Sequence, residues 1–133
     1  MRLTQESEYA VKIVVYLTRI DRDRSANARE ISDSENISLK FALKILRKLC
    51  GGRIVESYRG IKGGYKLRRD PARISVKDVV ETMQGELFLT PALKGIRKKS
   101  QIRGNSVNEF LFDIQDEIRR AFTTQTFSKL ADN

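Results

Sequence analysis

The sequence predicts a mainly α-helical fold that carries one small β-hairpin, which we call the wing. Over most of the chain, apolar residues recur every three or four positions, which is the period of an amphipathic helix. After Gly52 and up to Leu67 the period changes to about two, which is typical of strands. A chain of 133 residues with 40% apolar content suits one globular domain with an appended arm.

Two helices are predicted in the first quarter of the chain. Apolar residues at helical spacing from Tyr9 to Leu17 favour an amphipathic helix over residues 5–20, with Thr4 as its N-cap. A charged connection follows. Asn27, with Glu30 three residues later, resembles a capping box that opens a short helix through about residue 35.

A third helix is predicted after a three-residue turn. Ser38 offers its N-cap, and the segment LKFALKILRKLCGG ends in two glycines, which we expect to adopt the left-handed conformation that stops a helix. The apolar residues of this helix share one face: Leu39, Ala42, Ile45, Leu46 and Leu49. Helix, turn and helix therefore follow one another closely.

The hairpin turns within the glycine-rich segment YRGIKGGYKL and is followed by a fourth helix. Ser75 and Asp78 form a capping-box pattern at the start of this helix, and Gly85 ends it. Helix, helix, turn, helix and hairpin is the element order of a winged helix-turn-helix domain, which we place over residues 1–85.

The rest of the chain is predicted to be a loop and one long helix. Residues 86–105 contain glycine, proline and five cations, and we expect a flexible loop with at most a short helix. Residues 106–133 hold the long helix and a C-terminal tail. Its apolar seam would expose too much surface in a soluble monomer unless the helix folds onto the winged domain or pairs with a second copy, and we favour pairing. The seam consists of Phe110, Leu111, Ile114, Ile118 and Phe122.

Positive charge is concentrated in one quarter of the chain. The net charge is +9, and residues 38–69 carry it all, with ten cations against the single acid Glu56. Such a balance is expected of a protein that binds a polyanion. A lysine-rich helix fits a major groove of about 12 Å, with the hairpin in the neighbouring minor groove. The cations are Lys40, Lys44, Arg47, Lys48, Arg53, Arg59, Lys62, Lys66, Arg68 and Arg69.

At these residues the sequence also resembles the Rrf2 family of IscR-like and NsrR-like regulators over most of its length. The resemblance lies in the opening MRLTQESEYAV, the helix ISLKFALKILRKL, and the continuous segment VESYRGIKGGYKLRRDPARISVKDVVETMQG. It implies a bacterial transcription regulator, here expected to be a repressor, that binds a double-stranded DNA operator as a homodimer. It also implies that the long C-terminal helix mediates dimerisation.

The residues and the resemblance together give a set of expected DNA contacts. We expect the major groove to be contacted by Ser38, Lys40, Phe41 and Lys44. Arg59 and Lys62 are expected in the minor groove, because a guanidinium at the tip of a hairpin suits the negative potential of a narrow groove. The phosphates are expected to be contacted by Arg2, Lys48 and Lys66.

Several of these assignments have structural alternatives. The glycines of the hairpin are also consistent with a turn that serves only to relieve backbone strain. The lysines of the third helix are also consistent with a solvated face. Phe41 is either a contact to a base methyl group or a core residue, whereas Cys50 is expected to be a small core residue.

The chain departs from the family in the loop before the long helix. The resemblance implies three cysteines there that hold an iron-sulfur cluster, but alignment by eye places Ala92, Ser100 and Ser106 at their positions and Asn108 near that of a histidine. Alanine and neutral serine do not bind iron as thiolates do. We therefore expect no cofactor. The chain is either a natural member that senses another signal or none, or a form whose cysteines were replaced.

Other classes of function are less consistent with the sequence. The chain lacks histidine and shows no Ser-base pair, so we do not expect an enzyme. Two alternatives stay open: a winged-helix module that binds protein or RNA, and a regulator with a small-molecule pocket under residues 86–104. The N-terminus resembles neither a signal peptide nor a membrane span, which favours a cytoplasmic protein without a membrane partner.

Overall fold

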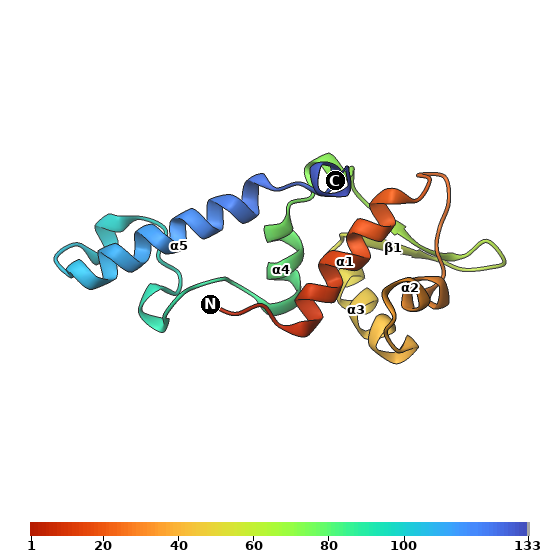
Figure 1. Cartoon of the computed structure of the whole chain (residues 1–133), viewed down its shortest axis with the longest axis horizontal. Coiled ribbons are helices and arrows are strands. Elements are labelled where there is room, and N and C mark those ends of the chain that lie inside the picture. Colours follow the sequence, from red (N-terminus) through yellow and green to blue (C-terminus); the bar gives the residue numbers. More distant parts are fainter. Residues whose placement is uncertain (133) are drawn as a thin grey trace.

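A computed structural model describes residues 1–132 and is mainly α-helical with one two-stranded antiparallel sheet, as predicted (Figure 1). Six α-helices lie in this part of the chain: α1 (Gln5–Arg19), α2 (Ala28–Glu35), α3 (Leu39–Gly51), α4 (Val76–Gln84), α5 (Ser106–Thr124) and α6 (Phe127–Ala131). The two strands are β1 (Val55–Tyr58) and β2 (Gly64–Leu67). Three 3-10 turns complete the order: η1 (Pro71–Arg73), η2 (Pro91–Leu93) and η3 (Lys99–Ile102).

Side-chain caps fix the starts of the helices where the sequence predicted them. Thr4 accepts a hydrogen bond from the backbone N–H of Ser7, and the Asn27 side chain accepts one from Glu30. Ser75 and Asp78 form the reciprocal capping box at α4. Each cap satisfies a backbone donor that would otherwise lack a partner within the helix.

The end of α3 differs from the prediction. Gly52 has φ −84°, and the residue in the left-handed conformation is Arg53, with φ 60°. The glycine is explained instead by a close approach between α3 and α4. A Cβ atom at Gly52 would lie 2.5 Å from Cγ2 of Thr82, so only glycine fits there without a shift of the neighbouring side chain.

The core lies between α1, α2, α3, α4 and the base of the wing. It also contains Phe127 of α6, whose side chain is fully buried. The C-terminal tail that was predicted to follow the dimerisation helix therefore returns to the winged domain. Two backbone hydrogen bonds hold it there, from Phe127 N–H to the Ile74 carbonyl and from Val76 N–H to the Gln125 carbonyl. The core of the predicted 1–85 domain is thus completed by the end of the chain.

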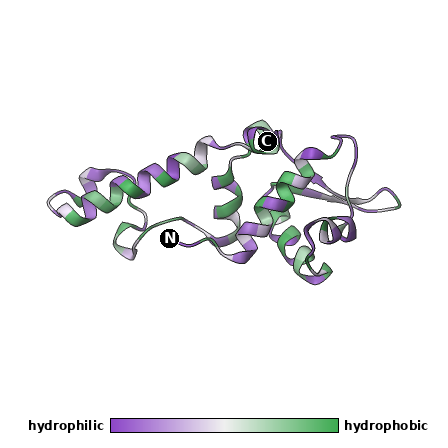
Figure 2. Cartoon of the chain, in the orientation of Figure 1, coloured by the Kyte–Doolittle hydropathy of each residue, from purple (hydrophilic) through white to green (hydrophobic). Residues whose placement is uncertain are grey.

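Helix α5 extends away from the winged domain, and residues 86–105 lie along it (Figure 1). These residues contain two 3-10 turns, one more short helix than expected. Apolar and polar residues alternate around α5 (Figure 2). Phe112 and Gln115 are its buried residues, whereas most of the predicted seam is partly exposed. The intramolecular fold therefore leaves apolar surface on α5 uncovered.

Candidate nucleic-acid interface

Helix α3 has one face in the core and one in solvent. Ala42, Ile45, Leu46 and Leu49 are fully buried, at the spacing of a single helical face. The opposite face carries Lys40, Leu43, Lys44, Arg47 and Lys48, all exposed. The sequence had placed Leu39 on the buried face, but it is only partly buried and lines the outer surface.

The turn before α3 sets its angle to α2. Asn36 takes the left-handed conformation at φ 54° and ends α2. Asparagine tolerates this conformation better than most residues. Ser38 then caps α3, since its Oγ accepts a 3.0 Å hydrogen bond from the N–H of Phe41. The Ser38 hydroxyl, predicted to face DNA, therefore also holds the start of α3.

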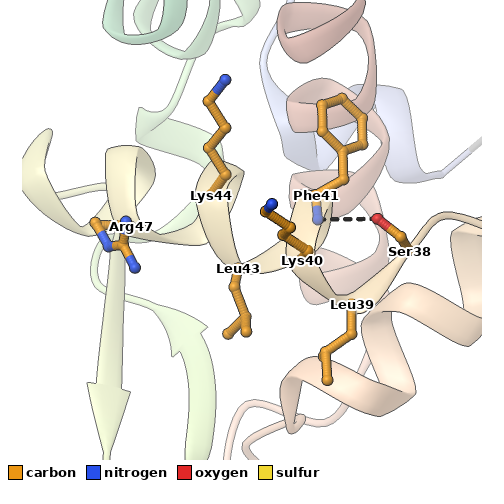
Figure 3. A pocket seen from close by; sticks show the side chains of 7 residues that line it. All are labelled: Ser38, Leu39, Lys40, Phe41, Leu43, Lys44 and Arg47. Atoms are coloured by element: carbon orange, nitrogen blue, oxygen red, sulfur yellow. Dashed lines mark hydrogen bonds between the residues drawn. The ribbon is translucent and has the colours of Figure 1, made fainter.

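Phe41 packs against the protein itself. Its ring meets Tyr9 of α1 edge-on, with ring centroids 5.8 Å apart and an interplanar angle of 79°. Figure 3 shows Phe41 pointing toward α1, away from Leu39 and Leu43. This geometry favours the core alternative for Phe41 over contact with a base methyl group.

Two of the predicted DNA-contacting lysines share one carboxylate. Glu6 of α1 lies 2.8 Å from Nζ of Lys44 through Oε1 and 2.7 Å from Nζ of Lys48 through Oε2. Hydrogen bonds from Lys44 and Lys48 lower the pKa of Glu6 below its usual 4.5. Sequence reasoning missed Glu6, because its partners lie about 40 positions away along the chain.

The wing is tied to the connection between α1 and α2. Ala26 and Tyr65 exchange two backbone hydrogen bonds, and Ser25 donates to the carbonyl of Lys62 over 2.7 Å. Gly64 allows this pairing, since a Cβ atom there would lie 2.5 Å from the Ala26 carbonyl oxygen. The residue also has φ +152°, which favours glycine. The glycine-rich hairpin is therefore held to the α1–α2 connection close to its turn, where Gly64 pairs with Tyr58.

The tip of the wing presents charged and apolar groups to solvent. Arg59 and Lys62 are both exposed, as the predicted minor-groove contacts must be. Ile61 lies between them, and its apolar side chain is fully exposed. The sequence pattern did not predict this exposed apolar residue. Within residues 1–132 neither Arg59 nor Lys62 forms an ion pair, and both side chains are exposed to solvent.

The strands of the wing carry a small side-chain cluster. Lys66 Nζ lies 4.8 Å from the centre of the Tyr58 ring, a cation–π contact. Tyr58 donates a hydrogen bond to Glu56, and this bond raises the pKa of Tyr58. Lys66, a predicted phosphate contact, thus lies over an aromatic ring.

Arg2, which is also a predicted phosphate contact, is exposed just before α1. Its backbone carbonyl accepts a hydrogen bond from the Gln84 side chain.

The loop at residues 86–105 packs onto α5 through a buried amide. Gln115 is fully buried, accepts a 2.7 Å hydrogen bond from the N–H of Leu89, and donates to the carbonyl of Leu93. Arg119 donates to the carbonyls of Leu87 and Ile96. Sequence reasoning missed Gln115, since a polar residue within an apolar helical pattern gives no indication of its partner.

The residues of this loop do not fit an iron-sulfur cluster. Ala92, Ser100 and Ser106 are all exposed, and none is a thiolate or imidazole ligand. Among residues 1–132 no group of three or more His, Cys, Asp or Glu side chains is arranged to hold a metal ion. Cys50 lies at the end of α3 against the core, where burial raises the pKa of its thiol.

The predicted dimerisation residues differ in their surroundings. Phe110 is 62% exposed and the neighbouring Val107 63%, whereas Leu111, Ile114, Ile118 and Phe122 are partly buried. Phe122 also packs against the core of the winged domain. The first half of α5 therefore carries the largest uncovered apolar side chains of this helix.

No helix within the described residues is both long and apolar enough to cross a membrane.

Comparison with known proteins identifies the relatives of this chain. A family described as "Rrf2: Iron-dependent Transcriptional regulator" matches residues 3–133. The HTH-type transcriptional regulator NsrR of Geobacillus kaustophilus is 32% identical over 89 residues, which are 67% of this chain and 60% of that protein. NsrR of Bacillus licheniformis is 26% identical over 95 residues, 71% of this chain and 66% of that protein. The chain spans about half to two thirds of the length of the curated relatives it matches.

Solved structures share the fold. CymR of B. subtilis, described as the global cysteine regulator, superposes with a TM-score of 0.83 at 19% identity, over 99% of this chain and 97% of that one. T. potens IscR superposes with a TM-score of 0.79 at 17% identity, over 99% and 87% of the two chains. The matched family and the NsrR relatives are transcriptional regulators and not enzymes.

Proposed function

Because the chain belongs to the Rrf2 family of transcriptional regulators, we propose that it is a sequence-specific repressor that binds double-stranded DNA as a homodimer and without an iron-sulfur cluster. Helix α3 enters the major groove, and the wing reaches the adjacent minor groove. Occupation of an operator excludes the transcription machinery from the same stretch of DNA.

The observation that carries this proposal is the concentration of charge on α3 and the wing. The ten cations of residues 38–69 belong to these two elements and their flanks, and exposed ones include Lys40, Arg47, Arg59 and Lys62. Helix α3 contains no acidic residue, and within residues 1–132 its lysines form ion pairs with Glu6 of α1. Such a surface attracts a phosphate backbone.

The dimer is supported by the exposed apolar side chains of α5. Val107 and Phe110 project from a helix that extends away from the winged domain (Figure 1). A second α5 packed against the first covers both side chains and places two α3 helices on one duplex. A palindromic operator follows from this two-fold symmetry.

The cluster-free form is supported by the chemistry of the loop. The whole chain has one cysteine and no histidine, so even a dimer supplies two thiolates, whereas a cluster needs about four ligands of thiolate or imidazole type. A small-molecule pocket under the loop has less support, because Leu93 and Gln115 fill the space between the loop and α5.

Selection of binding sites from a random duplex library tests the proposed function. We expect enrichment of a palindrome, and a logarithm of the binding constant that falls linearly with the logarithm of salt concentration. Duplex RNA should compete poorly, because its deep and narrow major groove does not admit a helix. A pool that stays random, or RNA that displaces the DNA at equal concentration, would contradict the proposal and favour the RNA or protein module. Transcription in vitro from a promoter that overlaps the palindrome then tests repression.

A further inference from the structure

The outer face of α3 carries two parallel rows of side chains. Residues four apart lie one above another on a helix, about 6 Å apart along its axis. One row is basic and consists of Lys40, Lys44 and Lys48. The other begins with two apolar residues and ends with a cation, as Leu39, Leu43 and Arg47.

The two rows point in different directions. Glu6 holds Lys44 and Lys48 beside α1. Leu39 and Leu43 point to the opposite side of α3 from Lys44 and Phe41 (Figure 3). Leu43 is 36% exposed, and both leucines line an open pocket together with Ser38, Lys40 and Arg47. Leu43 lies outside the core cluster, to which α3 contributes Ile45, Leu46 and Leu49.

We propose that Leu43, supported by Leu39, reads the C5-methyl group of thymine in the major groove, an inference that rests on the proposed DNA-binding function. Thymine is the only base whose major-groove edge presents an apolar group, and apolar side chains distinguish it from cytosine by contact with this methyl. Leu43 is thereby a specificity-determining residue, whereas the lysine row supplies affinity that is independent of sequence.

The charges around the leucines favour DNA as the occupant of this surface. The pocket is lined by Lys40, Lys44 and Arg47 and by no acidic residue. A protein helix docked on two leucines would need acidic flanks of its own to match these cations. A duplex supplies phosphates on both sides of the groove and a methyl group at its floor, so it satisfies both the charged and the apolar groups at once.

Replacing thymine by deoxyuridine in the selected operator tests the inference. This change removes the methyl group and leaves the hydrogen-bonding edges of the base pair intact. We expect the parent protein to lose about fourfold in affinity for each contacted methyl, since burial of one such group is worth about a factor of four. Replacement at thymines outside the palindrome should change nothing.

Variants assign the effect to the residue. Leu43→Ala should bind the thymine operator more weakly than the parent does. It should no longer distinguish the two operators, so its affinities for the thymine and deoxyuridine operators should be equal. Leu43→Gln, which keeps the length of the side chain but makes its tip polar, should lose the discrimination in the same way. Lys40→Ala is the matched control on the neighbouring row. It should weaken binding to both operators by the same factor, so that the ratio of the two affinities stays unchanged.

The outcomes separate the two proposals. If no duplex is enriched, DNA binding itself is wrong, and the reading of thymine falls with it. If the parent binds a palindrome but no replacement by deoxyuridine within it changes the affinity, the role of Leu43 is refuted while the proposed function stands. If both Leu43 variants unfold at the parent's temperature and still distinguish thymine from deoxyuridine, another residue contacts the methyl group. This result also refutes the role of Leu43.

Discussion

The carboxylate of Glu6 lies 2.8 Å from Nζ of Lys44 and thereby links the start of α1 to the candidate DNA-reading helix. Lys48 occupies the other oxygen of the same carboxylate. Glu6 therefore orients two lysines and also cancels part of their charge. A phosphate that approaches α3 competes with Glu6 for both cations.

We expect Glu6→Gln to lower the free energy of unfolding by up to about 1 kcal/mol at pH 7, because both lysines are largely exposed. The lowered pKa of Glu6 means that its contribution is complete above the unfolded value of about 4.5 and is lost as pH falls through the lower folded value. Urea unfolding of parent and variant at pH 7 and pH 3 measures this. The difference between them should shrink at pH 3; an equal difference at both pH values would exclude the ion pair as its source. Glu8→Gln, which breaks a pair between two exposed groups, is the control.

The same substitution should strengthen binding to DNA of any sequence. Removing the carboxylate frees Lys44 and Lys48 for phosphates and steepens the dependence of affinity on salt. Titration of an unrelated duplex at several salt concentrations measures both changes. Weaker binding by Glu6→Gln would show instead that the carboxylate is needed to position the lysines.

Arg59→Ala should weaken binding to the selected palindrome by about 1 to 3 kcal/mol and relax the preference for A·T steps beside each half-site. The reason is that a guanidinium at the wing tip gains most from a narrow minor groove. Lys129→Ala, a change of one exposed charge on α6, is the matched control and should leave affinity nearly unchanged. Equal affinity of Arg59→Ala and parent would mean that the wing does not enter the groove.

Phe110→Ser should shift the protein from dimer to monomer at micromolar concentration. The side chain is 62% exposed, so its removal leaves the fold of one chain largely intact while it weakens an apolar interface. Sedimentation velocity measures the change, and operator affinity should fall with it. Glu117→Ser, a change of an exposed polar residue on the same helix, should remain dimeric. A parent protein that is already monomeric would contradict the dimer.

Gln115→Met should destabilise the packing of residues 86–105 on α5 by about 1 to 3 kcal/mol, since it leaves the Leu89 N–H and the Leu93 carbonyl without their partner. Amide hydrogen exchange should increase at Leu89. Gln101→Met is the control, because Gln101 accepts hydrogen bonds from exposed backbone in the same loop. Unchanged exchange at Leu89 would show that the amide does not hold the loop.

Anaerobic incubation with iron and sulfide should leave the protein colourless between about 320 and 420 nm, because it lacks the roughly four thiolate or imidazole ligands that a cluster needs. Affinity for the palindrome should be equal in air and under reductant. Cysteine introduced together at Ala92, Ser100 and Ser106 is the companion variant, and recovery of colour would show that the loop keeps a cluster-binding geometry. A brown parent protein with stoichiometric iron would refute the cluster-free form.

Local sequence patterns were sufficient to place the starts of four helices. Caps at Thr4, Asn27, Ser38 and Ser75 act within three residues of the chain, so a local pattern suffices to place them. The charge of residues 38–69 is likewise a property of composition, and it indicated a polyanionic partner before any fold was known. The hairpin followed from the change of period.

Long-range packing determines which side chains of these elements are exposed. Leu43 and Phe41 sit two positions apart on one helix, yet Phe41 packs on Tyr9 while Leu43 remains exposed. Glu6 meets Lys44 and Lys48 across the domain, and Phe127 returns from the far end of the chain to the core. Periodicity gives the orientation of a side chain about its own helix, but its neighbours depend on how distant segments pack, and these long-range contacts decide both burial and charge pairing.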